Sequence, residues 1–125
     1  MLLENDLPSR RDYGHYSDGK YYLYNCGDLP MPFKLYIPID SVAQDITISC
    51  GDEKLVLKNV SAIGRESFLL IDSEEQVLLG CDSKYNKINN LYNYTIAEGN
   101  FFSIPTGSAI LVAPKGTLKF DYLYI

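Results

Sequence analysis

The chain has 125 residues, which suits one domain that buries its own hydrophobic core. Its net charge is −5, so it lacks the excess of Lys and Arg that binding to nucleic-acid phosphates requires. No apolar run approaches the length of a membrane span, and residues 1–14 are too polar and acidic for a signal peptide. We therefore expect a globular protein made in the cytoplasm that neither binds nucleic acid nor inserts into a membrane.

Residues 1–20 are rich in charge and turn formers and end in Ser17-Asp-Gly19, so we predict an N-terminal arm or linker there, followed by one domain over 21–125. The domain opens on Tyr21-Tyr-Leu-Tyr24. Adjacent residues of a strand face opposite ways, so one face of this strand shows aromatic surface to solvent or to a partner. Tyr22 and Tyr24 are therefore candidate contact residues.

Apolar residues alternate with other residues over 33–39 and again over 46–50. This period of two places one side of each strand in the core and the other in water. Pro38 lacks a backbone donor, which indicates a sheet edge or a strand end. The Gly-Asp pair within 50–53 predicts a tight reversal.

The next two runs, 67–71 and 77–79, are more densely apolar, so we place them in the interior of a sheet. The Asp72-Ser-Glu-Glu75 segment between them is a predicted turn. Residues 83–96 contain four Asn and are interpreted as a loop, and alternation returns over 118–124. Strands recurring every 8–12 residues or so are typical of an antiparallel β-sandwich or barrel.

The inventory of catalytic residues is small. His15 is the only histidine, it lies in the predicted arm, and we interpret it as an exposed side chain. Asp72, Glu74 and Glu75 share one predicted turn, where all three carboxylates should point into solvent instead of flanking a cleft. No glycine-rich phosphate loop or C-x-x-C pair occurs. We therefore predict no enzyme activity, no cofactor and no metal, and we interpret the three cysteines as free, mostly buried thiols.

Two adjacent aromatic residues, Phe101 and Phe102, lie between turn signals in EGNFFSIPTGSAI. The pair could line a ligand site or fill the core. Both cannot point inward from one strand, so we expect one to fill the core and the other to lie at an edge or under a loop. Gly107 closes the Pro-Thr-Gly turn, where we expect a positive φ angle.

The same stretch, GNFFSIPTG, resembles a signature of the C-terminal domain of siphophage distal tail proteins, which is close to Gly-x-Phe-Phe-x-Leu/Ile-Pro-x-Gly before an apolar strand. The matching positions are Gly99, Phe101, Phe102, Ile104, Pro105 and Gly107, followed by Ile110, Leu111 and Val112. The similarity extends over about 21–124. This chain departs from the family pattern at Ala109, where the family often has Asn, and at Leu123, where it often has Arg. Further similar segments are Tyr24-Asn-Cys-Gly-Asp28 before 33–39, Leu70-Ile-Asp72 with Gln76-Val77, and Leu118-Lys-Phe-Asp-Tyr122.

The resemblance implies a galectin-like, jelly-roll-like β-sandwich. In this family the domain is an accessory to an N-terminal domain that forms a hexameric hub at the tail tip and joins the tail tube to the baseplate. The present chain would be a fragment or a stand-alone relative, monomeric in isolation, whose longer parent is a hexamer. Its expected location is the virion tail tip, and its expected partners are other tail-tip or baseplate proteins.

Two functions remain open: a structural protein that acts by protein–protein contact, and a module that binds carbohydrate on a host surface. The carbohydrate alternative predicts exposed aromatic rings flanked by Asn, Asp or Glu. Such residues concentrate only over 85–94, and the candidates there are Tyr85, Asn90, Tyr92 and Tyr94. The His-Asn-Arg and Trp cluster of sugar-binding galectins is absent from the sequence.

Overall fold

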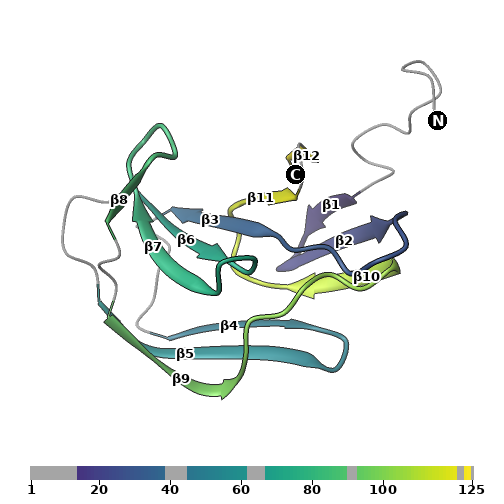
Figure 1. Cartoon of the computed structure of the whole chain (residues 1–125), viewed down its shortest axis with the longest axis horizontal. Helices are drawn as coiled ribbons and strands as arrows, with labels where there is room; N and C mark the ends of the chain where they lie inside the picture. Colours follow the sequence, from purple (N-terminus) through teal and green to yellow (C-terminus); the bar gives the residue numbers. More distant parts are fainter. Residues whose placement is uncertain (1–13, 39–44, 62–66, 90–92, 121–122, 125) are drawn as a thin grey trace.

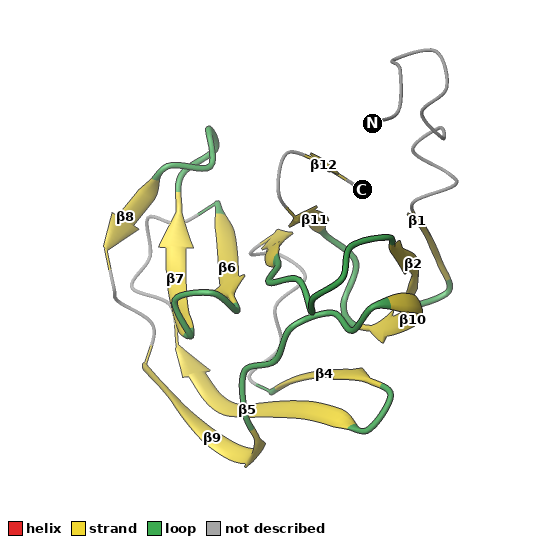
Figure 2. Ribbon diagram, turned by 45° about the vertical axis from the view of Figure 1, so that its right-hand side comes forward, coloured by secondary structure: helices red, strands yellow, loops and turns green. Residues whose placement is uncertain are grey.

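The protein is an antiparallel β-sandwich of two packed sheets (Figure 1), known here from a computed structural model. The structure describes residues 14–38, 45–61, 67–89, 93–120 and 123–124. These segments contain strands, turns and loops but no helix (Figure 2). Accordingly, none of them offers a helix that is long and apolar enough to cross a membrane. The two-sheet sandwich expected from the sequence is confirmed.

In the described part of the chain each sheet has six strands, and every neighbouring pair is antiparallel. The first sheet has the order β1-β2-β10-β4-β5-β9, with the bounds β1 Gly14–Ser17, β2 Lys20–Asn25, β10 Gly107–Val112, β4 Ile46–Cys50, β5 Glu53–Ser61 and β9 Asn93–Gly99. The second sheet has the order β12-β11-β3-β6-β7-β8, with the bounds β12 Leu123–Tyr124, β11 Thr117–Phe120, β3 Lys34–Pro38, β6 Phe68–Asp72, β7 Val77–Cys81 and β8 Lys87–Asn89.

The core between the sheets is built from the alternating positions that the sequence shows. Along β2, for example, Tyr21 and Leu23 are buried, while Tyr22 and Tyr24 face solvent. The largest fully buried side chains of this core are Tyr21, Phe33, Leu35, Ile37, Ile48, Leu55, Leu57, Leu69, Ile71, Ile104 and Leu111. Burial of this apolar surface is the main force that holds the sheets together.

The second sheet is apolar on both faces of β3, β6 and β7. Tyr36, Leu70, Leu79 and Cys81 form a separate buried cluster on the face that points away from the core. Strands buried on both faces lose the alternating pattern, which explains the dense apolar runs at 67–71 and 77–79. The prediction that these runs lie inside a sheet is confirmed, since β6 and β7 both have neighbours on each side.

Three expectations at the level of local structure need correction. The sandwich includes residues 14–17 of the predicted arm, because β1 pairs with β2 through a hairpin at Asp18-Gly19. Residues 83–96 are not one loop, because they include β8 and most of β9. Polar side chains fit both places because, among the described residues, β1 and β9 are the edge strands of the first sheet and are paired on one side only.

The third correction concerns Asp72, whose carboxylate was expected in solvent. Asp72 is fully buried, while Glu74 and Glu75 are exposed as expected. Its Oδ1 accepts hydrogen bonds from the backbone N–H groups of Glu74 (3.0 Å) and Glu75 (3.1 Å). These local bonds replace water at Oδ1, as Asp side chains do in Asx turns, whereas the buried Oδ2 has no hydrogen-bond partner among the described residues. The residue therefore shapes the β6–β7 hairpin.

Phe101 and Phe102 have structural roles, which answers the question that the pair raised. Phe102 is buried in the core, where its ring lies 5.6 Å from that of Phe33. Phe101 is half-buried and packs against the same core. The connection that carries them is fixed by a two-way backbone bridge between Met31 and Ile104. Asn25 adds a third tie, since its Nδ2 donates to the Ile104 carbonyl.

Acid should weaken the turn that follows β7. The backbone N–H groups of Asn86 and Lys84 donate to the Asp82 carboxylate and hold its pKa below the ordinary value of 3.8. A pKa that is lowered by folding stabilises the protein above the unfolded-state value, and this contribution is lost as the pH falls through the folded-state value. We expect wild type to melt above Asp82→Asn at pH 7 and the two melting temperatures to converge toward pH 2. A constant difference across this range would contradict the assignment.

Candidate interaction surface

Four large apolar side chains are exposed together on the outer face of the first sheet. They belong to the neighbouring strands β2 and β10, and we call them the β2–β10 face: Tyr22, Tyr24, Ile110 and Val112, exposed by 36%, 49%, 45% and 43%. In the sheet register Ile110 lies directly opposite Tyr22, and Val112 lies opposite Lys20. Directly opposed side chains of antiparallel strands are close neighbours, so these residues form one surface.

Tyr22 is held at the centre of this face by its neighbour on β1. His15 lies directly opposite Tyr22 in the sheet, and the two rings stack with centroids 5.0 Å apart and an interplanar angle of 16°. The stack holds one face of the Tyr22 ring against His15, while Ile110 adjoins it from β10. The only histidine of the chain thus acts as a support for Tyr22, on the strand that the sequence had assigned to an arm.

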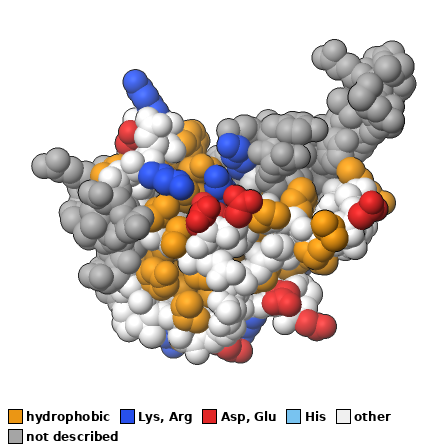
Figure 3. Space-filling model, viewed as in Figure 1, with side chains coloured by type: hydrophobic (Ala, Val, Ile, Leu, Met, Phe, Trp, Pro, Cys, Tyr) orange, Lys and Arg blue, Asp and Glu red, His pale blue; other side chains and the backbone are white. Residues whose placement is uncertain are grey.

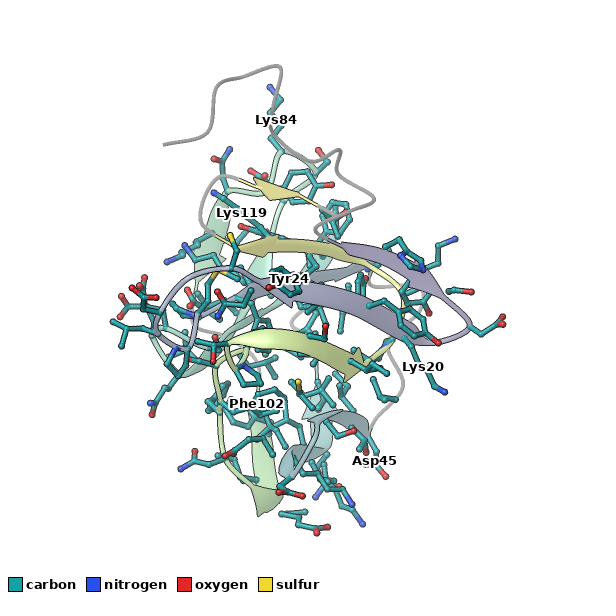
Figure 4. All side chains as sticks on the ribbon, turned by 90° about the vertical axis from the view of Figure 1, so that its right-hand side faces the viewer. Lys20, Tyr24, Asp45, Lys84, Phe102 and Lys119 are labelled. Atoms are coloured by element: carbon teal, nitrogen blue, oxygen red, sulfur yellow. The ribbon has the colours of Figure 1, made fainter. Side chains whose placement is uncertain are left out.

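A groove with a volume of about 730 Å³ runs over β10, between β2 and the end of β4. Its lining consists of Lys20, Tyr22, Leu23, Ser49, Cys50, Gly51, Pro105, Ser108, Ala109, Ile110 and Val112. Figure 4 looks toward this side of the molecule and shows Tyr24 and Lys20 near opposite ends of β2, with β10 alongside. The β2–β10 face and the groove therefore form one continuous site.

The groove carries little charge. Among the described residues that line it, Lys20 is the only charged one, and the other polar side chains are the hydroxyls of Tyr22, Ser49 and Ser108. The lining includes Cys50, which is buried in the core, and burial raises the pKa of this thiol above its ordinary value. Elsewhere, on the side shown in Figure 3, basic and acidic side chains lie next to each other. The site thus offers apolar contacts with one positive charge.

The structure separates the residues that the sequence proposed for a partner or glycan surface. Tyr22 and Tyr24 lie on the β2–β10 face, whereas Tyr85 packs on the outer face of the second sheet, stacked on Phe68 at 4.7 Å and edge-on to Tyr36 at 4.8 Å. Tyr94 is half-buried and packs against the core. Asn90 and Tyr92 lie outside the described residues. The described members of the 85–94 concentration therefore do not form one exposed platform.

Ile110 and Val112 belong to the site but were missed in the sequence. They lie in the run Ala109-Ile-Leu-Val112, where apolar residues occupy both faces of the strand and hide which of them point outward. Pairing of β10 with β2 settles the orientation, because buried Leu111 lies opposite buried Tyr21. Within the described ranges, no cluster of three or more His, Cys, Asp or Glu side chains is arranged to hold a metal ion.

Comparison with known proteins gives no relative: the chain matches no protein-family profile, no curated protein and no solved structure.

Proposed function

We propose that this chain is a structural domain that binds another protein through the β2–β10 face. The observation that carries the proposal is the grouping of Tyr22, Tyr24, Ile110 and Val112 on two paired strands, each more than a third exposed. Exposed apolar patches of this kind often mark contact sites on soluble proteins. Tyr-rich composition with little charge is also typical of interface cores.

The resemblance of GNFFSIPTG to the distal tail protein signature suggests which kind of structure the domain serves. We propose an accessory domain of a phage or prophage tail-tip hub, located at the virion tail tip, with baseplate or tail-tip proteins as partners. The β-sandwich agrees with the fold that the resemblance implies. The proposed role is mechanical and involves no catalysis.

A protein partner fits this site better than a carbohydrate does. Carbohydrate sites pair aromatic rings with side chains that hydrogen-bond sugar hydroxyls, usually Asn, Asp or Glu. The described lining of the groove contains none of these three, and Ile110 and Val112 supply aliphatic surface instead. Tyr85, the exposed aromatic residue beside Asn86, is already engaged by two neighbouring rings. We therefore favour protein–protein contact over glycan recognition.

A matched pair of isoleucine variants tests the proposal. Ile110 on the β2–β10 face and Ile96 on the edge strand β9, opposite Leu57, are exposed by 45% and 42%, so aspartate at either position can reach solvent. We expect Ile110→Asp to reduce incorporation of the protein into purified phage particles by about tenfold, the effect of losing one interface hot spot. Ile96→Asp should be incorporated like wild type. Incorporation is measured by quantitative mass spectrometry of the particles.

Equal incorporation of the two variants would contradict a contact through this face. Absence of the wild-type protein from the particles would contradict the tail-tip role itself. Circular dichroism of both variants checks that each keeps its strand content.

A further inference from the structure

We infer that the element docking on the β2–β10 face is a short amphipathic α-helix of the partner protein, lying along β2 and β10 with a carboxylate beside Lys20. This inference deepens the proposed function and rests on it. It specifies what covers the face, and three properties of the surface support it: its area, its shape and its charge.

The area is too small for a stable dimer of this chain. A large side chain exposes roughly 150–250 Å² when free, so four of them at 36–49% exposure offer on the order of 300 Å². Stable protein complexes bury about 800 Å² on each partner. The four side chains supply less apolar area than the roughly 450 Å² that is apolar in such an interface, and their area matches the footprint of a single secondary-structure element. The isolated chain should accordingly stay monomeric.

The shape of the surface favours a helix. An α-helix with its side chains is about 10–12 Å wide, and neighbouring strands lie about 4.8 Å apart, so a helix covers two strands. The apolar residues occupy two neighbouring strands, β2 and β10. From Lys20 to Tyr24 the surface extends for about 13 Å at 3.3 Å per residue. This length corresponds to between two and three helical turns of about 5.4 Å each.

Strand addition is not available at this place. β2 is paired with β1 on one side and with β10 on the other, so its backbone groups are already used. An incoming strand gains its affinity from backbone hydrogen bonds to an open sheet edge. A helix forms its own backbone bonds and docks through side chains at positions i, i+3, i+4 and i+7. Contacts to the face of β2 therefore come from side chains.

Lys20 defines the charge of the partner. It lies directly opposite Val112 at one end of the face and is the only charged residue among the described residues of the groove lining. A helix whose apolar stripe covers Tyr22 and Ile110 would leave this ammonium group at the margin of the contact. A Glu or Asp beside the stripe would pair with it, and a Lys there would be repelled.

The test is an NMR titration of the ¹⁵N-labelled 125-residue chain with synthetic helical peptides of about four turns. One peptide set carries Leu at i, i+3, i+4 and i+7 with Glu flanking the stripe in each register, and a second set carries Lys in place of Glu. A third peptide has the composition of the first but its Leu residues dispersed around the helix. A hexamer of N-acetylglucosamine serves as the carbohydrate probe.

We expect saturable shifts confined to β2 and β10 for at least one Glu peptide, and weaker binding of the dispersed and Lys peptides. Ile110→Asp should weaken binding about tenfold, and Ile96→Asp should not. Lys20→Glu should reverse the preference, so that the Lys peptide binds better than the Glu peptide. This reversal separates a specific pair from a general loss of apolar surface.

Each of four outcomes would overturn the inference. The first two are equal binding of the dispersed peptide and an unchanged preference of Lys20→Glu for the Glu peptide over the Lys peptide. The other two are binding of the saccharide alone and no peptide binding. The particle-incorporation test of Ile110→Asp reports separately on the proposed function. Loss of incorporation without peptide binding would leave a protein contact at this face and reject the helix as its occupant.

Discussion

Gly99→Ala should destabilise the domain by roughly 3 kcal/mol or more, because left-handed backbone strain and a steric clash coincide there. Gly99 ends β9 with a φ angle of +73°, a conformation that L side chains rarely adopt. A Cβ at this position would lie 1.7 Å from the backbone carbonyl oxygen of Lys54. This oxygen belongs to β5 and accepts the N–H of Asn100, so relief of the clash would separate β9 from β5. Urea unfolding monitored by circular dichroism measures the decrease in the free energy of unfolding.

Gly107 provides the matched control. Its φ angle is +83°, as the sequence predicted for this turn, but apart from its chain neighbours no atom of the described residues lies within 4 Å of the Cβ position. Gly107→Ala should therefore cost only the strain of the left-handed conformation, about 1–2 kcal/mol. Gly107→Val should cost about 1–3 kcal/mol. If Gly99→Ala cost no more than Gly107→Ala, the close approach of β9 and β5 would be wrong.

The second large effect is expected at Phe102. Its ring is 6% exposed and packs against Phe33, so Phe102→Ala should lower the free energy of unfolding by about 3–5 kcal/mol, the usual cost of a large cavity. The half-buried ring of Phe101 should matter less, and Phe101→Ala is expected to cost about half as much. Chemical denaturation of both variants under the same conditions compares them.

Similar losses in the two variants would contradict the division of roles between the rings. A larger loss in Phe101→Ala would reverse it. Either result would also contradict the path of the chain between β9 and β10, which the backbone bridge between Met31 and Ile104 holds in place.

Period-two alternation predicts the central strands because burial acts on one face of each. Tyr21 and Leu23 point inward while Tyr22 and Tyr24 point outward, which follows from the pleat once the strand is recognised. The edge strands carry no such signal. Gly14–Ser17 and Asn93–Gly99 are mostly polar or small. Their strand conformation depends on pairing with β2 and β5 and not on the local propensity of their own residues.

Local hydrogen bonding explains the error at Asp72. The clustered acidic residues predict three carboxylates in solvent, but two backbone N–H groups of the turn donate to Oδ1 of Asp72 and offset part of the cost of its burial. Turn geometry of this kind depends on the hairpin register, which composition does not show. Tyr85 is a comparable case, since it is 41% exposed yet its ring packs against Phe68 of β6 and Tyr36 of β3.

Half of the β2–β10 face could be predicted from sequence. Tyr22 and Tyr24 alternate with buried residues, so their exposure follows from the pattern of one strand. Ile110 and Val112 required the pairing of β10 with β2, because Ala109 and Leu111 are apolar as well. The site therefore combines one strand whose face the sequence reveals with one whose face only the sheet register decides.

Site-directed photo-cross-linking tests the central claim, protein contact through the β2–β10 face, most directly. A benzophenone amino acid replaces Tyr22 in one protein and Ile96 in a matched control, both exposed positions of the first sheet. After assembly into phage particles and irradiation, we expect the protein labelled at position 22 to be joined to a tail-tip or baseplate protein, identified by mass spectrometry. The protein labelled at 96 should remain uncross-linked. Cross-links from position 96 but none from position 22 would contradict the account.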